Sequence, residues 1–185
     1  MNQTQNPISE VYAVFAGDIN QANVAKIFDG VVTAMNKNCP RLHLLFQSFG
    51  GFVGDGVCLY NFFRALPMDL VLYNAGTVYS IATIAYLGAK SRKVSAHAAF
   101  MIHRTHTTPQ MTNAERLKVV ANALDIDDAR TEAILRAHLS MPDEQWAVHR
   151  YGDLHIDANQ AVAFGIADEI AEFSPPLGQM IFQIA

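Results

Sequence analysis

The chain has 185 residues, 51% of them hydrophobic and 16% charged, and its formal net charge at pH 7 is -4. This length indicates one domain with a sizeable core, and the acidic balance argues against a nucleic-acid-binding protein, which usually presents a basic face. Its two cysteines make no disulfide framework and no apolar run approaches the roughly 20 residues of a membrane span, so we expect a cytoplasmic protein without membrane contact.

The first half of the chain alternates between strand and helix patterns. Residues 1–10 are polar, do not resemble a secretory signal and are expected to be flexible. We then expect three strands, at Val11–Ala16, Leu42–Phe46 and Asp69–Tyr73, and three helices, at about 20–36, 54–66 and 80–87. This alternation predicts an α/β fold with repeated β-α-β units and a mainly parallel sheet.

The second half should complete one domain spanning residues 1–185. We expect short strands at 93–95 and 98–103, and a long helix at 112 to about 139. A short helix that begins at Pro142 and contains Trp146, another at 157–164 and a last strand at 167–170 should follow. The long helix exceeds what a small core needs, so it should project or pack on another subunit. The apolar tail, residues 174–185, needs cover from this subunit or a neighbour, and the high apolar content favours an oligomer.

Ser80 is the first candidate for chemistry. Ala75-Gly76 interrupts an apolar strand, and Ser80 then stands at the start of a helix of small apolar residues. A hydroxyl there would lie beside unpaired backbone N–H groups and the positive end of the helix dipole, which stabilise a developing oxyanion. Serine is also a common N-cap residue, which is the simpler interpretation of this position alone. The G-x-S-x-G motif of α/β-hydrolases is absent.

His103 and Asp153 could activate such a hydroxyl. A serine nucleophile needs a base, and His103 closes an apolar strand. A strand histidine is more often a satisfied core residue, and alternation should turn His106 to the opposite face. Most aspartates before a short helix are caps or turn residues. Asp157 suits that role, which leaves Asp153 free to orient a histidine.

Gly50-Gly51 follows the second predicted strand, at the sheet edge where active sites of parallel sheets gather. Such a pair is usually a tight turn, but it also allows a main-chain N–H to approach a substrate carbonyl. No nucleotide-binding glycine motif is present, and no Cys/His cluster has metal-ligand spacing. We therefore expect neither a cofactor nor a metal.

Together these residues resemble the proteolytic subunit of the Clp protease, within the crotonase-like fold group, over about residues 11–170. The resemblance lies in a glycine loop, a nucleophile segment, a base segment and a segment that places Asp153 at the acid position: Gln47–Gly51, Gly76–Ser80 with Gly88-Ala89-Lys90, Met101-Ile102-His103 and Ala161–Asp168. The stretch at about 105–140 resembles the projecting handle region of that family.

This resemblance implies a serine endopeptidase. Ser80 would be the nucleophile, His103 the general base and acid, and Asp153 its orienter. The N–H groups of Gly51 and Ile81 would form the oxyanion hole. Peptides or unfolded proteins would be hydrolysed through an acyl-enzyme, inside a homo-oligomeric ring or two stacked rings.

Several residues depart from the family pattern. Phe49 replaces the usual proline, and Tyr79 replaces a small residue before the nucleophile. An alignment fixed on Gly88 would move Tyr79 into the nucleophile position, but Gly76 keeps its spacing to Ser80. Only about ten residues precede the first strand, too few for the axial loop that engages a Clp-type ATPase, which argues against dependence on one.

Two other functions remain open. The chain could be a non-catalytic scaffold or regulatory ring subunit of the same fold. It could also be a crotonase-type acyl-CoA enzyme, since that fold holds an oxyanion with backbone N–H groups as well.

Overall fold

The main sheet of the computed structural model, which describes residues 10–108 and 113–184, has six strands. Their order is β8-β5-β3-β2-β1-β9, and every neighbouring pair is parallel. The strands are β1 Val11–Ala16, β2 Arg41–Gln47, β3 Asp69–Asn74, β5 Ser91–Val94, β8 Glu169–Ile170 and β9 Ile181–Ile184. The predicted α/β class with a mainly parallel sheet is therefore confirmed.

A second, smaller sheet carries the segments that matter for chemistry. Its strands are β4 Thr77–Tyr79, β6 Ala99–Ile102 and β7 Leu154–Asp157, in the order β4-β6-β7. The β4–β6 pair is parallel and the β6–β7 pair is antiparallel. Strand β4 joins the two sheets, because Val78 forms an isolated bridge with Ser48 at the end of β2.

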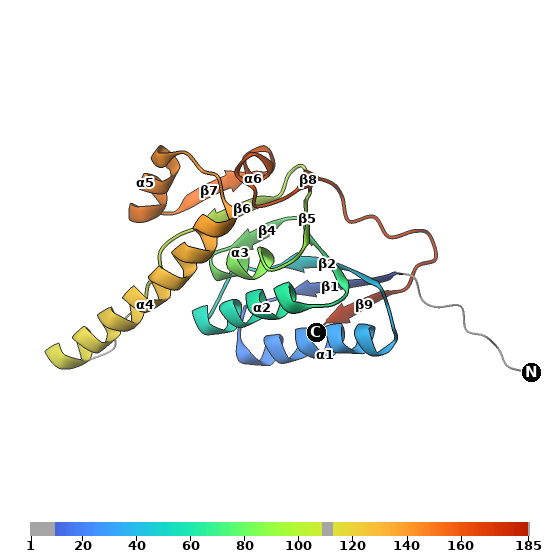
Figure 1. Ribbon diagram of the computed structural model, residues 1–185, viewed down its shortest axis with the longest axis horizontal. Coiled ribbons are helices and arrows are strands. Elements are labelled where there is room, and N and C mark those ends of the chain that lie inside the picture. The colour runs from blue at the N-terminus through green and yellow to red at the C-terminus, as the bar shows by residue number, and fades with distance from the viewer. Residues whose placement is uncertain (1–9, 109–112, 185) are drawn as a thin grey trace, which may run out of the picture.

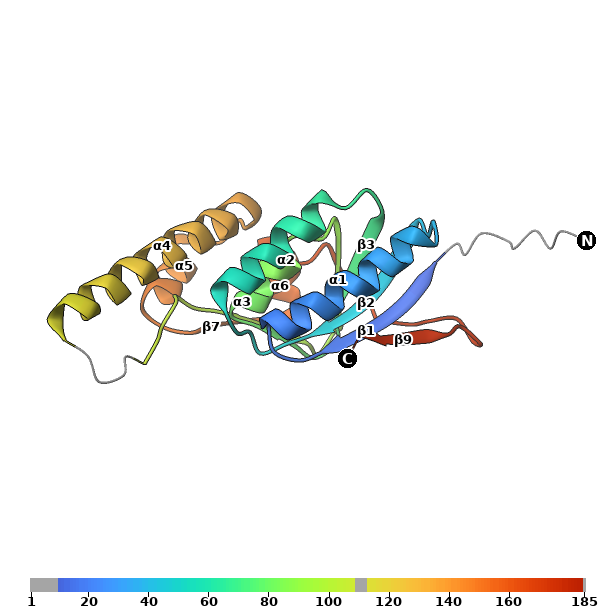
Figure 2. The ribbon, with the colours of Figure 1, turned by 90° about the horizontal axis from the view of Figure 1, so that it is seen from below.

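Six helices accompany these sheets in the described residues: α1 Gln21–Asn36, α2 Val53–Ala65, α3 Ile81–Tyr86, α4 Ala114–His138, α5 Asp143–Tyr151 and α6 Ala158–Phe164. Right-handed crossovers between successive neighbouring strands place α1 and α2 on the same face of the main sheet, where Figures 1 and 2 show them side by side. Ile27 of α1 and Leu59 of α2 are fully buried there against Leu44 and Phe46 of β2.

The first three predicted strands and helices are confirmed to within two residues at either end. Three strands were missed. Strand β4 has only three residues and follows Gly76, whose pattern predicts a turn, and β7 has only four residues, which directly precede the helix α6. The third is β9, which lies in the apolar tail. It pairs with β1 of the same chain, so the tail packs against its own subunit.

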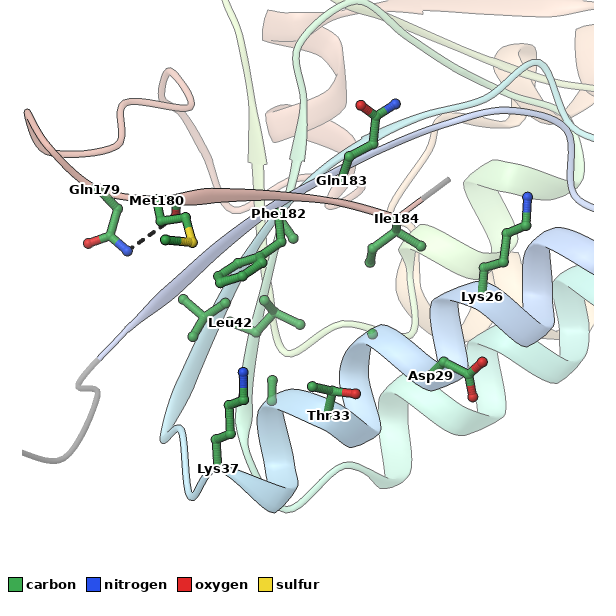
Figure 3. A pocket seen from close by; sticks show the side chains of 14 residues that line it. Lys26, Asp29, Thr33, Lys37, Leu42, Gln179, Met180, Phe182, Gln183 and Ile184 are labelled. Atoms are coloured by element: carbon green, nitrogen blue, oxygen red, sulfur yellow. Dashed lines mark hydrogen bonds between the residues drawn. The ribbon is translucent and has the colours of Figure 1, made fainter. Parts of the chain in front are cut away.

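An apolar groove of about 590 Å³ lies between β9 and α1 (Figure 3). Phe182 and Ile184 form one wall, and Gly30 of α1 allows the close approach. A Cβ atom on Gly30 would lie 2.9 Å from Cδ1 of Ile184. None of the predicted site residues lines this groove.

The long helix α4 projects from the body, at the end of the molecule away from β9 (Figures 1 and 2). Most of its side chains are exposed, and Asp128 and Leu135 are its buried residues. The predicted projecting helix is thus confirmed. Among the described residues, no helix is both long and apolar enough to cross a bilayer.

Candidate active site

Ser80 stands between β4 and α3 in a strained backbone conformation. Its φ of 55° and ψ of -132° lie where residues other than glycine are rare. A hydrogen bond of 2.7 Å from its backbone N–H to the carbonyl of Met101 holds it beside β6. Ser80 occupies the N-cap position of α3, yet its side chain makes no capping hydrogen bond. The simple capping interpretation therefore fails.

The Ser80 hydroxyl instead meets an imidazole. Ser80 Oγ lies 2.7 Å from His103 Nε2, and His103 Nδ1 lies 3.2 Å from Asp153 Oδ1. The small sheet explains this arrangement, because antiparallel pairing sets Ile102 opposite Leu154 and the next residue pair is His103 with Asp153. The structure thus brings together all three side chains that the sequence predicted, through a hydrogen bond between Ser80 and His103 and a 3.2 Å contact between His103 and Asp153, the arrangement that a nucleophile, base and orienter need.

Asp157, by contrast, has the structural role that the sequence predicted for it. Its carboxylate accepts a hydrogen bond of 2.8 Å from the N–H of Gln160, and the Gln160 side chain accepts one from the N–H of Asp157. This capping box begins α6. Asp153, whose side chain is 58% exposed, is left to face His103.

The Gly50-Gly51 turn lies directly against Ser80. Both glycines have positive φ, 104° and 154°. A Cβ on Gly50 would lie 2.8 Å from Ser80 Cβ, and one on Gly51 would overlap the carbonyl oxygen of Ile19, so neither position accepts a side chain. Backbone bonds on both sides fix the turn: Ile19 N–H donates to Gly50 O and Phe52 N–H donates to Ile19 O, both at 2.8 Å.

In the described part of the chain, the N–H groups of Gly51 and Ile81 donate to no protein acceptor. Both residues line one hollow of about 300 Å³ together with Ser80 and His103. A carbonyl carbon at Ser80 Oγ would therefore have two free donors nearby for its oxygen. The rest of the hollow has a mixed lining, with apolar side chains such as Val53, Ile84 and Leu135 beside polar ones such as Thr105 and Thr131.

A second histidine shares this hollow, which corrects one expectation. The ring centroids of His103 and His106 lie 4.9 Å apart, and both residues line the hollow. The prediction that His106 faces the opposite side is wrong, because β6 ends at Ile102 and strand alternation does not continue beyond it.

Two opposing influences set the charge state of His103. Burial lowers its pKa below the ordinary histidine value, and the neighbouring His106 lowers the pKa further. Asp153 and Asp128 act in the other direction without cancelling these effects. The imidazole is therefore held neutral, which is the form that can accept a proton from a hydroxyl.

Asp128 is a residue of this site that sequence reasoning missed. It is a buried carboxylate on α4, and its two oxygens bind one side chain and one backbone N–H in the segment just after His103. Oδ2 accepts from Arg104 Nε and Oδ1 from the N–H of Thr105, each at 2.7 Å. Nothing in the pattern of the long helix distinguished Asp128 from its solvent-facing acidic neighbours.

Next to the hollow, a broader groove of about 740 Å³ runs between the glycine turn and α4. Phe49, Gly51, Val53 and His106 line both spaces, so the two lie next to each other. Among the described residues, no group of three or more His, Cys, Asp or Glu side chains is arranged to hold a metal ion.

Comparisons with known proteins place the chain among Clp proteases. The profile of a family described as Clp protease matches residues 2–174. ATP-dependent Clp protease proteolytic subunit 3 of Rhodococcus jostii is 27% identical over 71% of this chain and 68% of its own length. The proteolytic subunit of Solanum tuberosum is 27% identical over 75% of this chain and 71% of its own. The solved structure of a ClpP1 mutant from Listeria monocytogenes matches with a TM-score of 0.76 at 19% identity, covering 89% of this chain and 92% of the other.

Proposed function

Because the chain belongs to the Clp protease family, we propose that it is a serine endopeptidase whose nucleophile is Ser80. The observation that carries this proposal is the 2.7 Å contact between Ser80 Oγ and His103 Nε2. The Ser80 side chain makes no capping hydrogen bond to α3. Asp153 orients His103, and the N–H groups of Gly51 and Ile81 form the oxyanion hole.

The chemistry follows from these positions. Ser80 Oγ attacks the scissile carbonyl while His103 Nε2 takes its proton, and Asp153 stabilises the resulting imidazolium through Nδ1–H. The carbonyl oxygen becomes an oxyanion against the two backbone N–H groups. Collapse of this intermediate breaks the C–N bond, and His103 returns its proton to the leaving amine. Water then attacks the acyl-enzyme by the same route, which frees Ser80.

The hollow beside Ser80 indicates which substrates fit. Its volume of about 300 Å³ and its lining of apolar side chains and threonines suit an uncharged side chain on the acyl side of the scissile bond. An extended peptide or an unfolded chain can present such a side chain to the hollow. We propose that the chain acts on these substrates as a homo-oligomeric ring in the cytoplasm.

Labelling with a fluorophosphonate tests the proposal. The reagent should phosphonylate Ser80 of the intact protein, and peptide mapping by mass spectrometry should locate the adduct there. Ser80→Ala should abolish labelling without changing the oligomer measured by light scattering. An assembled but unlabelled protein would favour a non-catalytic scaffold. Absence of labelling at Ser80 together with protection by acyl-CoA against thermal unfolding would favour a crotonase-type enzyme.

The lowered pKa of His103 predicts the pH dependence of this labelling. The neutral imidazole is the active form. The labelling rate should therefore stay constant as the pH falls to the ordinary histidine pKa of about 6.5, and should decrease only at more acidic pH. His106→Ala removes a group that lowers this pKa and should move the midpoint to higher pH. Asp153→Asn removes a charge that raises it and should move the midpoint to lower pH. Phosphonylation rates of the three proteins across the acidic range check both directions, and a shift of either variant in the other direction would contradict the assignment.

A further inference from the structure

Phe49 and Tyr79, the two departures from the family pattern, lie side by side next to Ser80. Their ring centroids are 5.8 Å apart with an interplanar angle of 85°, and Tyr79 makes a similar contact with His155, at 5.8 Å and 81°. We call Phe49, Tyr79 and His155 the aromatic row. It joins three distant segments: the glycine turn, β4 and β7.

In the small sheet, the aromatic row lies close to the triad residues. Tyr79 pairs with Met101 on β6, and Met101 pairs with His155 on β7. His103 directly follows β6 and Asp153 directly precedes β7, so both lie at the ends of the strands that carry Met101 and His155. Ser80 directly follows Tyr79. The aromatic row therefore lies next to all three triad residues.

The aromatic row is open to solvent rather than part of the core. Phe49 is 66% exposed and lines both the hollow beside Ser80 and the groove along α4. His155 is also exposed, and Tyr79 is half-buried. Val78, Phe100 and Ile156 on the opposite face of the same sheet are fully buried and already supply the packing. An exposed phenylalanine edge beside a nucleophile is therefore available to a ligand.

The position of the aromatic row relative to His103 indicates which part of a substrate reaches it. The acyl side chain has the hollow lined by Ile81, Ile84 and Leu135, whereas His103 must face the leaving amine to protonate it. Of the aromatic row, Phe49 borders that hollow, whereas Tyr79 and His155 are not among its lining residues. Asp153, an exposed carboxylate, lies two residues before His155, which disfavours an acidic side chain at the same place.

We propose that the aromatic row binds an aromatic side chain at the first residue of the leaving peptide, and so makes this chain selective for cleavage before Phe, Tyr or Trp. The inference rests on the peptidase activity proposed above. Edge-to-face contacts with Phe49 and Tyr79 supply the selectivity, and acidic residues are the poorest at this position.

Internally quenched peptides that differ only in this residue test the proposal. The intact protein should cleave the phenylalanine peptide about three- to tenfold faster in kcat/KM than the alanine peptide, the effect of one or two aromatic contacts. The glutamate peptide should be slower than both. Phe49→Ala and Tyr79→Ala should reduce the phenylalanine preference to within twofold. Tyr151→Ala, which removes an 85% exposed aromatic residue of α5 outside both spaces, should keep it.

An activated ester with the same acyl group and no leaving amino acid separates this proposal from the proposed function. Phe49→Ala and Tyr79→Ala should each lose more rate on the phenylalanine peptide than on the ester, because the ester places no side chain on the aromatic row. Tyr79 does not line the hollow for the acyl group, so Tyr79→Ala should also keep the ester rate of the unchanged protein. Equal losses on ester and peptide, or a phenylalanine preference that survives both substitutions, would overturn the proposal. If Ser80 is not labelled and no ester is hydrolysed, the proposed function itself fails.

Discussion

Replacing His103 with alanine is expected to lower kcat for peptide hydrolysis by roughly 10⁴- to 10⁶-fold, as for the base of other serine peptidases. The reason is geometric as well as chemical. His103 Nε2 is 2.7 Å from Ser80 Oγ, and at neutral pH a serine hydroxyl without a proton acceptor is a weak nucleophile. Peptide hydrolysis and the rate of phosphonylation at Ser80 should fall together, because both need the same proton transfer.

The second histidine provides a matched control. His106 lies 4.9 Å from His103 between ring centroids and lines the same hollow, but it makes no described hydrogen bond to Ser80. His106→Ala should therefore change kcat at neutral pH by less than tenfold, with its main effect on the pH midpoint. If His106→Ala abolished activity and His103→Ala did not, the assignment of the base would be wrong.

Gly51→Ala is expected to lower kcat by roughly 10²- to 10³-fold, the effect of losing one oxyanion donor. The φ of 154° at Gly51 puts any Cβ onto the carbonyl oxygen of Ile19, which is backbone and cannot move aside. The turn must then shift, and the N–H of Gly51 moves with it. The loss should appear in kcat more than in KM, since the interaction is strongest in the transition state.

Gly54→Ala is the control for the backbone change. Gly54 lies in the first turn of α2, and the nearest atom to its Cβ position is Arg130 Nη2 at 4.0 Å. Alanine there should keep activity and raise the midpoint of thermal unfolding, because glycine is the poorer helix former. The far-ultraviolet circular dichroism of both variants shows whether they fold. A folded Gly51→Ala protein with full kcat would exclude Gly51 from the oxyanion hole.

Much of the architecture could be predicted because its signals are local. Apolar strands followed by helices with a buried stripe define each β-α-β unit, and the residues that end them are easy to recognise in the sequence. Ser80, His103 and Asp153 were proposed as partners through a family pattern, since no local spacing links residues so far apart in the chain. Their approach depends on the pairing of β6 with β7, and β7 itself was not predicted.

Other parts of the site could not be predicted, for physical reasons. Asp128 acts through a tertiary contact between α4 and the backbone after His103, and an aspartate on a polar helix gives no sign of that contact. His106 was placed by strand alternation that stops before it. The aromatic row exists only because three separated segments meet across the small sheet.

The pairing of β9 with β1 has a consequence for how the protein is made. Strand β1 leaves the ribosome early, whereas β9 is synthesised after all the other strands described. Throughout translation the backbone N–H and C=O groups on that flank of β1 therefore have no partner, and an unpaired flank of this kind invites pairing with another nascent chain. The pairing of β9 with β1 also joins residues that are far apart in the sequence, so it forms late and slowly. Nascent chains should consequently depend on chaperones until their last strand is in place.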